Sequence, residues 1–476
     1  MDTTNPTTPT TRTIPGVSIF GSPSDETLAR IEALIAAFLL DDFIVDQIAI
    51  SSETSIGLSA RHATATIGTT GVHKRAYYVE GSPYDLGYLT GRLAEPSVSR
   101  MTTTFLDNVV LSFLGVHLDP VLQKIIGSLL ADVAFLGAKR SIPDVPQAYQ
   151  DELNGILAGC RAANPMTKVT TDRLWTLNVG IDSALAFIYT LKLPSVLPMH
   201  VPLKPEHFRI PFMCTGYTLS GTDNEQKPFH YFGRDFMFTT ADVFQDTACP
   251  IIYRPTGGQP MVSVSAPGWM GSITAMNAAG VAGSVNMAPS ALCNPERPGL
   301  NSLLLNRDAV QNGATANDAL QVMVQAQRGC SWIHILADGG TDDAYVVEAG
   351  MSQPGIDFMS YPPSQLATAL QGVPQLLQEY PPPVQNGLVA RAADSPFPSE
   401  YISNVNPGLF AAFKANPGSF HYDVQPTYTY TYTPTAFANG GFVNATCNTH
   451  NCPMGLYFAP PRQGVDNLLV ATNRFI

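Results

Sequence analysis

The chain has 476 residues and a formal net charge of −12, and only 13% of its residues are charged, against about 25% in an average protein. An acidic chain with so few charges is a poor electrostatic partner for phosphate backbones, which argues against nucleic-acid binding. Hydrophobic residues make up 45% of the chain, enough for a large core. No apolar run reaches the roughly 20 residues that a membrane-spanning helix needs.

The first half of the chain predicts mainly helices. Residues 1–16 are rich in Thr and Pro and are expected to be disordered; without a basic or apolar leader, they also predict a cytoplasmic protein. Ser24 opens an amphipathic helix that begins with acidic residues. Residues 64–80 alternate in polarity and predict one or two strands. Apolar residues recur with helical spacing in 99–139, 146–162 and 171–190.

From about Phe208 the pattern changes to strands. Two strand-like runs flank the turn residues 221–224 and predict a β-hairpin. Further strands follow as far as residue 350, with one helix expected near 302–327. Strands, then helices, then strands favour layered sheets with helices packed outside.

The seven cysteines are odd in number and irregular in spacing, which is typical neither of a disulfide framework nor of a zinc site. We therefore expect mostly buried thiols, and no metal or organic cofactor. Cys447 and Cys452 flank His450, and a plain loop or a loop disulfide is favoured there over a metal site.

Cys214 is the first candidate for chemistry, although a single cysteine is more often a small buried hydrophobic residue. Its surroundings change that interpretation. The run CTG at 214–216, followed by YFGRDFMF at 231–238, resembles the opening hairpin of the Cys-type N-terminal nucleophile hydrolases, as in penicillin V acylase and choloylglycine hydrolase.

Further blocks follow in the same order. AMNAAGVAGSVNMAP at 275–289 resembles a segment of these enzymes that has one Asn on a turn and a second, here Asn286, on the next strand. WIHILADGGTDDAYVVEAG at 332–350 resembles their paired strands. Upstream, EGSPYDLGYLTG at 80–91 and YQDELNGILAG at 149–159 are similar to the acyl-coenzyme A:6-aminopenicillanic acid acyltransferase family.

The resemblance implies an α+β fold, a four-layer αββα sandwich with an N-terminal helical prosegment. On this interpretation the chain has five parts: an N-terminal extension (1–70), a mostly helical prosegment (71–213), the hydrolase core (214–350), an insertion or cap (351–461) and a returning core strand (462–476).

The resemblance also implies a mechanism. The precursor cleaves itself between Met213 and Cys214, which frees the α-amine of Cys214. An α-amine has a pKa near 7.7–8.0 and can act as a base, so nucleophile and base lie on one residue. The expected reaction is hydrolysis or acyl transfer on a small N-acyl compound through a cysteine acyl-enzyme.

Four other residues receive roles from the resemblance. Asn286 and Asn473 would donate hydrogen bonds to the oxyanion, and Arg234 would stabilise the thiolate. The related acylases carry an acid three residues after this Arg, where the chain has Met237. Asp235 is expected to take over that role, or to point away from the site because strand side chains alternate.

The substrate and partners stay open. Tyr217 and Trp269 are expected to line the acyl pocket, with core packing as the alternative. The apolar stretch 105–137 keeps a phospholipase B-like or lipid amidase activity as the rival, and a non-catalytic binding protein of the same fold as a second. We expect a small N-acyl or lipid-like substrate and leave homo-oligomer formation open.

Overall fold

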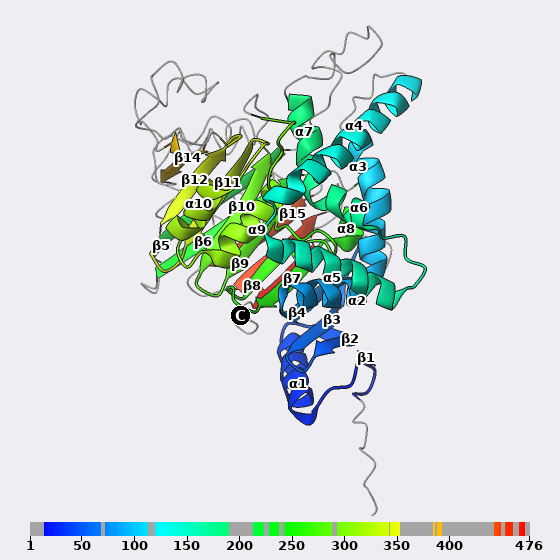
Figure 1. Cartoon of the computed structure of the whole chain (residues 1–476). Coiled ribbons are helices and arrows are strands. Elements are labelled where there is room, and N and C mark those ends of the chain that lie inside the picture. Colours follow the sequence, from blue (N-terminus) through cyan, green and yellow to red (C-terminus); the bar gives the residue numbers. More distant parts are fainter. Residues whose placement is uncertain are drawn as a thin grey trace, which may run out of the picture.

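The computed structural model of the chain describes residues 14–67, 72–112, 120–189, 213–222, 228–237, 241, 243–287, 293–341, 343–352, 384–385, 388–392, 442–448, 453–459 and 466–471. It shows a mixed α+β structure (Figure 1). The helices are α1 (Asp25–Leu39), α2 (Pro83–Arg100), the π-helix η1 (Met101–Phe105), α3 (Leu106–Ser112), α4 (Pro120–Ser141), the 3₁₀ turn η2 (Ile142–Asp144), α5 (Gln147–Ala163), α6 (Thr171–Trp175), the π-helix η3 (Thr176–Gly180), α7 (Ile181–Tyr189), α8 (Phe244–Thr247), α9 (Ser302–Asn312) and α10 (Ala316–Gln325).

The strands form one twelve-stranded and one five-stranded sheet. In the large sheet the order is β1 (Ser18–Phe20), β2 (Phe43–Ser52), β3 (Ser55–Ile67), β4 (Val72–Gly81), β7 (Cys249–Pro255), β8 (Met261–Ser265), β9 (Thr274–Asn277), β10 (Val281–Met287), β11 (Trp332–Asp338), β12 (Ala344–Ala349), β14 (Leu388–Ala392) and β13 (Val384–Gln385). In the small sheet the order is β17 (Asp466–Ala471), β16 (Pro453–Ala459), β15 (Phe442–Asn448), β6 (Pro228–Met237) and β5 (Met213–Thr222).

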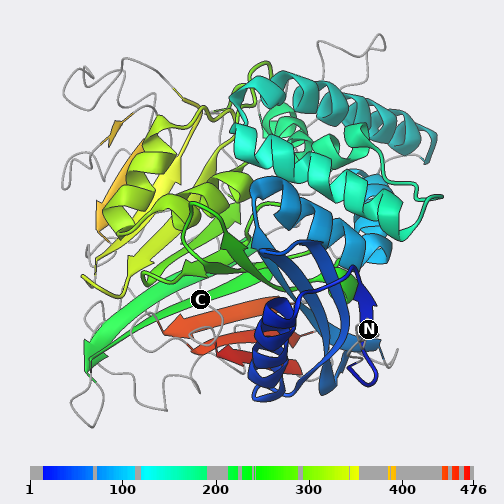
Figure 2. The same cartoon turned by 60° about the horizontal axis from the view of Figure 1, so that its bottom comes forward.

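Both halves of the chain contribute to the large sheet. β4 pairs in parallel with β7, with Tyr77 opposite Ile251, although the predicted cleavage site lies between these strands in the sequence. Strands from the stretch expected as an insertion or cap extend both sheets, because β14 pairs with β12 and β15 pairs with β6. Figure 2 shows β15–β17 (red) beside the long β5–β6 hairpin (green).

Successive residues of β4 and β7 pack into two different hydrophobic cores. Tyr77 and Ile251 belong to the core that contains residues of α2, α5 and α9. Tyr78 and Ile252 belong to the core that contains residues of α1 and Phe232 of β6. Because strand side chains alternate between faces, α2, α5 and α9 cover one face of the large sheet, and α1 and the small sheet lie over the other.

The described elements thus supply three layers: helices, large sheet and small sheet. They establish no helical layer on the outer face of the small sheet, so the four-layer αββα arrangement stays a prediction. Within the ranges given above, every helix falls short of the length and apolarity that crossing a bilayer demands.

The expected elements are largely confirmed. α1 begins after Ser24, whose side chain accepts a hydrogen bond from the Thr27 N–H at 3.2 Å, and β5 and β6 form the predicted hairpin. The single helix expected over 302–327 is wrong. α9 ends before Gly313, and Thr315 starts α10 with a capping box to Asp318, so a turn divides the segment.

Helices α2 and α5 pack at unusually short range. Gly87 and Gly91 of α2 face Gly155 and Gly159 of α5, and a Cβ added at any of the four would collide with the backbone of the other helix. The four glycines lie in the two segments whose sequence resembles the acyltransferase family. Their structural role is to allow this backbone contact.

A buried ion pair joins this helical layer to the core. The guanidinium of Arg307 on α9 donates to both carboxylate oxygens of Glu152 on α5, at 2.7 and 2.8 Å, and to the Met270 carbonyl at 2.8 Å. Both side chains are almost fully buried, and the guanidinium lies 4.0 Å from the ring centroid of Tyr253. Desolvation raises the pKa of Glu152 even beside this cation.

Replacing Arg307 by Leu should destabilise the fold by about 3–5 kcal/mol at neutral pH, because it leaves the Glu152 carboxylate buried without its partner. A carboxyl whose folded pKa is raised destabilises the fold as pH rises above its unfolded pKa. The loss of unfolding free energy in this variant, measured by urea unfolding, should therefore be larger at about pH 8 than at about pH 5. As a control, Lys139→Ala removes the half-exposed pair with Asp172 and should cost no more than about 1 kcal/mol. An equal loss in both variants would contradict this account.

Candidate functional site

The candidate nucleophile lies at the start of the β5–β6 hairpin. Met213 is the first residue of β5 and Cys214 the second, so the predicted cleavage site coincides with the beginning of the strand. The register pairs Cys214 with Phe236 and Gly216 with Arg234. In an antiparallel pair, opposite residues share a face of the pleat, which puts positions 214 and 234 on the same face of the hairpin.

The remaining hairpin candidates fall on the other face. Asp235 is opposite Thr215, and Tyr217 is opposite Gly233. Both pairs are an odd number of residues along the strand from Cys214, so they lie on the opposite face of the pleat. Of the two outcomes that the sequence left open for Asp235, the register favours the one in which it lies away from position 214.

The face of the hairpin that holds position 214 is the one toward the large sheet. Phe232, two residues before Arg234, is fully buried and shares a core with Ala282 and Ile335 of the large sheet. β5 itself contacts β10 and β11. The strand with the candidate nucleophile therefore packs against the strand that carries Asn286.

Asn286 lies on the face of β10 that this packing covers. It is paired with Ile333 of β11 and has the same parity along the strand as Ala282. Its side chain is only 2% exposed, and its Oδ1 has no hydrogen-bond partner among the described residues. The expected position on the strand after a turn is confirmed.

Two other residues on the same face also carry a buried polar atom without a described hydrogen-bond partner. Thr274 of β9 is directly opposite Ser284 of β10, and both are buried. Neither the Thr274 Oγ1 nor the Ser284 Oγ has a partner among the described residues. Leaving a buried polar group unsatisfied costs about 1–3 kcal/mol, and all three of these groups lie on the face that the β5–β6 hairpin covers. Nothing in the sequence distinguishes these two residues from ordinary strand positions.

The neighbouring Asn277 shows what a structural asparagine looks like here. It is as deeply buried as Asn286 and lies at the end of β9. Its Nδ2 donates to the carbonyls of Val310 and Gly313 at 2.6 and 2.7 Å, and its Oδ1 accepts from the Ala279 and Val281 N–H groups. Asn277 therefore fixes the β9–β10 turn, as the resemblance implied for its position.

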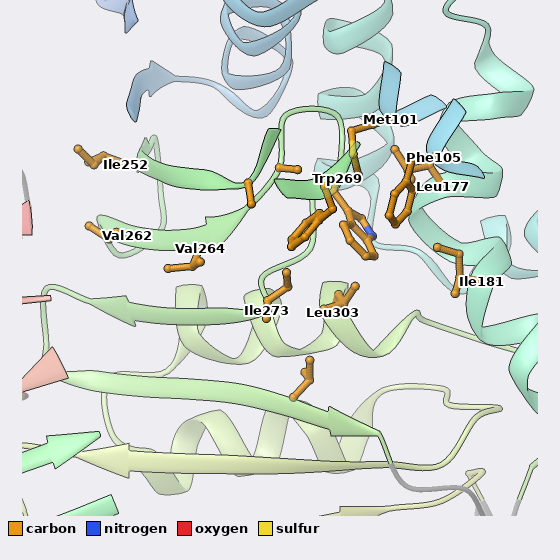
Figure 3. Packing of buried hydrophobic residues seen from close by; sticks show 14 of the residues in the cluster. Met101, Phe105, Leu177, Ile181, Ile252, Val262, Val264, Trp269, Ile273 and Leu303 are labelled. Carbon is orange, nitrogen blue, oxygen red and sulfur yellow. The ribbon is translucent and has the colours of Figure 1, made fainter. Parts of the chain in front are cut away.

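Trp269 lies in a closed aromatic cluster (Figure 3). It is 2% exposed, and its ring centroid is 5.5 Å from Phe105 and 6.0 Å from Phe244. Figure 3 shows Met101, Leu177, Ile181, Ile273 and Leu303 around it. The structure thus shows the packing that was the alternative to lining an acyl pocket.

His334 of β11 is opposite Val285, on the face turned away from Asn286. Burial lowers its pKa to about 3, so the ring is neutral at physiological pH. The expected site residue Asn473 lies outside the described residues. Within the described part of the chain, no three His, Cys, Asp or Glu side chains gather as metal ligands would.

Comparisons with known proteins give limited information. No protein-family model matches the chain. A protein of Archaeoglobus fulgidus, described only as uncharacterized, is 30% identical over 298 residues, which are 62% of this chain and 47% of that protein. The chain thus spans about half the length of this curated relative.

Among solved structures, an N-acylethanolamine-hydrolyzing acid amidase ortholog of Caenorhabditis elegans matches with 10% identity and a TM-score of 0.32. The match covers 50% of this chain and 93% of that one. A likeness this weak supports no statement about the fold or activity of this chain.

Proposed function

We propose that the protein is a self-processing hydrolase that cleaves or transfers the acyl group of a small N-acyl compound, with Cys214 as the nucleophile. One observation carries this proposal. The strand that begins with Met213 and Cys214 packs against β10, and the buried Asn286 lies on the face of β10 that this packing covers.

The chemistry follows from an N-terminal cysteine. Cleavage of the Met213–Cys214 bond frees an α-amine, which accepts the thiol proton. The thiolate attacks the amide carbonyl of the substrate, and the N–H groups of the Asn286 carboxamide are donors for the resulting oxyanion. The ammonium returns its proton to the departing amine as the C–N bond breaks, and the acyl group stays on the Cys214 sulfur as a thioester. Water or a second amine then resolves the thioester.

Arg234 and Asn473 complete the proposed site. Arg234 shares the face of the hairpin with position 214, where a permanent positive charge would favour the thiolate. Asn473 is proposed as a second oxyanion donor from its sequence context alone. Because the register puts Asp235 on the other face of the hairpin, the mechanism gives it no role.

Cleavage would leave the two pieces associated. The parallel pairing of β4 with β7 and the Glu152–Arg307 ion pair both join the N-terminal piece to the C-terminal one. In addition, Asp182 of α7 accepts hydrogen bonds from the N–H and hydroxyl of Ser302, at 2.8 and 2.9 Å. The helical segment would thus act as a permanent layer of the mature enzyme.

Lipid amides are a second candidate for the substrate, favoured by a cavity between helices α3, α4, η3 and α7. Its volume is about 340 Å³ and its lining is mostly apolar; Leu106, Phe135 and Ile181 contribute to it, and Asp107 and Arg173 are its charged residues. This cavity falls largely within the apolar stretch that suggested a lipid substrate.

Wild-type protein should release amine from at least one member of a panel of N-acyl amino acids and N-acyl amines with acyl chains from acetyl to palmitoyl. The peptide beginning at Cys214 should gain the mass of the acyl group during turnover. Cys214→Ala should abolish both signals, whereas Cys249→Ser, at a thiol buried in β7, should keep them. Turnover confined to long chains would favour the lipid candidate. Activity that survives Cys214→Ala, or no acylation by any panel member, would contradict the proposal.

Replacing Asn286 by Leu should lower kcat by about 10²–10³-fold with little change in the unfolding midpoint, because an oxyanion donor acts mainly in the transition state. Asn277→Leu is the matched control. It removes four satisfied hydrogen bonds from the same β9–β10 unit, so its main effect should be a lower unfolding midpoint. Comparing kcat and thermal unfolding of both variants tests the assignment. An Asn286 variant that loses stability but keeps its kcat would make Asn286 a structural residue.

A further inference from the structure

Cys293 and Cys330 lie side by side although 36 residues separate them in the sequence. The N–H of Asn294 donates to the Gly329 carbonyl at 2.7 Å, and the N–H of Ser331 donates to the Cys293 Sγ at 3.1 Å. One contact joins the residues next to the two cysteines, and the other brings the Cys293 Sγ to the residue after Cys330, so the two cysteines lie close together.

This arrangement suits a disulfide. A disulfide needs Cα atoms about 4.4–6.8 Å apart. The hydrogen bond between Asn294 and Gly329, the residues next to the two cysteines, holds the segments close to each other. Both residues are thiols in the structure, with exposures of 6% for Cys293 and 3% for Cys330.

The two thiols differ in their readiness to react. The neighbouring Cys330 thiol, together with the hydroxyl and N–H of Ser331, lowers the pKa of Cys293. Burial raises the pKa of Cys330, which therefore stays protonated. Of two neighbouring thiols, the more acidic one reacts with an oxidant through its thiolate, and the other resolves the product.

We propose that Cys293 and Cys330 form a dithiol–disulfide couple that is oxidised by a hydroperoxide. The Cys293 thiolate attacks one peroxide oxygen, the O–O bond breaks, and Cys293 becomes a sulfenic acid while the other oxygen leaves as hydroxide or alkoxide. The Cys330 sulfur then attacks the Cys293 sulfur, an S–S bond forms, and the S–O bond breaks. The Cys330 proton and the departing oxygen leave as water, so two thiols and one hydroperoxide give a disulfide, water and the reduced alcohol or a second water.

The bond would tie down a segment close to the candidate site. Met287, next to Asn286, is paired with Trp332, which lies two residues after Cys330. The chain leaves β10 at Met287 and reaches Cys293 six residues later. A disulfide would therefore link Cys293 to a residue two positions before β11, and would close a loop that contains α9 and α10.

The test exposes full-length protein to hydrogen peroxide, blocks the remaining thiols by alkylation, and maps the digested peptides by mass spectrometry. The expected product is a linked pair of peptides containing Cys293 and Cys330, about 2 Da lighter than the two thiol peptides and separated again by dithiothreitol. The oxidised protein should also have a higher unfolding midpoint than the reduced protein.

Three cysteine variants test which thiols form the disulfide. Cys330→Ser should leave a sulfenic acid on Cys293 that dimedone traps, whereas Cys160→Ser and Cys249→Ser, at buried thiols whose pKa values are raised by burial, should keep the crosslink. Oxidation of Cys293 to sulfinic acid with Cys330 still open to alkylation would overturn the proposal. So would an unreacted Cys293 when other thiols are oxidised. If Cys330→Ser fails to fold, the peptide map of the wild-type protein decides alone.

Discussion

The contact between the β5–β6 hairpin and strands β10 and β11 is the feature on which the rest of the molecule depends. It closes a core in which the fully buried Phe232 packs with Ala282 and Ile335. Tight packing there should exclude polar groups, because an unpaired polar side chain in an apolar interior is costly. Yet Thr274, Ser284 and Asn286 lie on this covered face, each with a polar atom that has no partner among the described residues. In the proposed chemistry the hydroxyls of Thr274 and Ser284 would donate to a substrate carbonyl, and the Asn286 Oδ1, an acceptor, would take a hydrogen bond from the substrate amide N–H.

The N-terminal half of the chain is an integral part of the fold, because several of its elements pack into the C-terminal half. Its strand β4 lies in the middle of the large sheet, next to β7. Its helix α5 contacts α2 through facing glycines and holds the core helix α9 through the Glu152–Arg307 ion pair. Removing this half would uncover the face of the large sheet that α2 and α5 protect and would leave Arg307 buried without its partner. Cleavage before Cys214 would therefore change the covalent connection and leave the packing in place.

Local patterns in the sequence predicted the elements well, and tertiary contacts limited what more they could predict. The cap at Ser24 and the strand–turn–strand pattern around residues 221–224 are short-range signals, and both led to the right element. The single helix expected over 302–327 is wrong because α9 ends before Gly313 and Thr315 caps a separate helix, α10. The position of Asn286 was predicted from a sequence motif. The burial of Thr274 and Ser284 without described partners was not, because it depends on which face of the large sheet packs against the small sheet. The Cys293–Cys330 pair is likewise invisible to cysteine spacing, since a turn and two helices separate its members.

The most direct test of the central claim is the intact mass and N-terminal sequence of purified full-length protein, measured beside Cys214→Ser. We predict two associated pieces of 213 and 476 − 213 = 263 residues for the wild type, the larger beginning at Cys214. The variant should remain uncut or be cleaved far more slowly, because its hydroxyl is a weaker nucleophile than a thiol. A wild-type chain that stays intact after long incubation, under conditions in which it is folded, would contradict the self-processing mechanism and favour a binding protein of this fold.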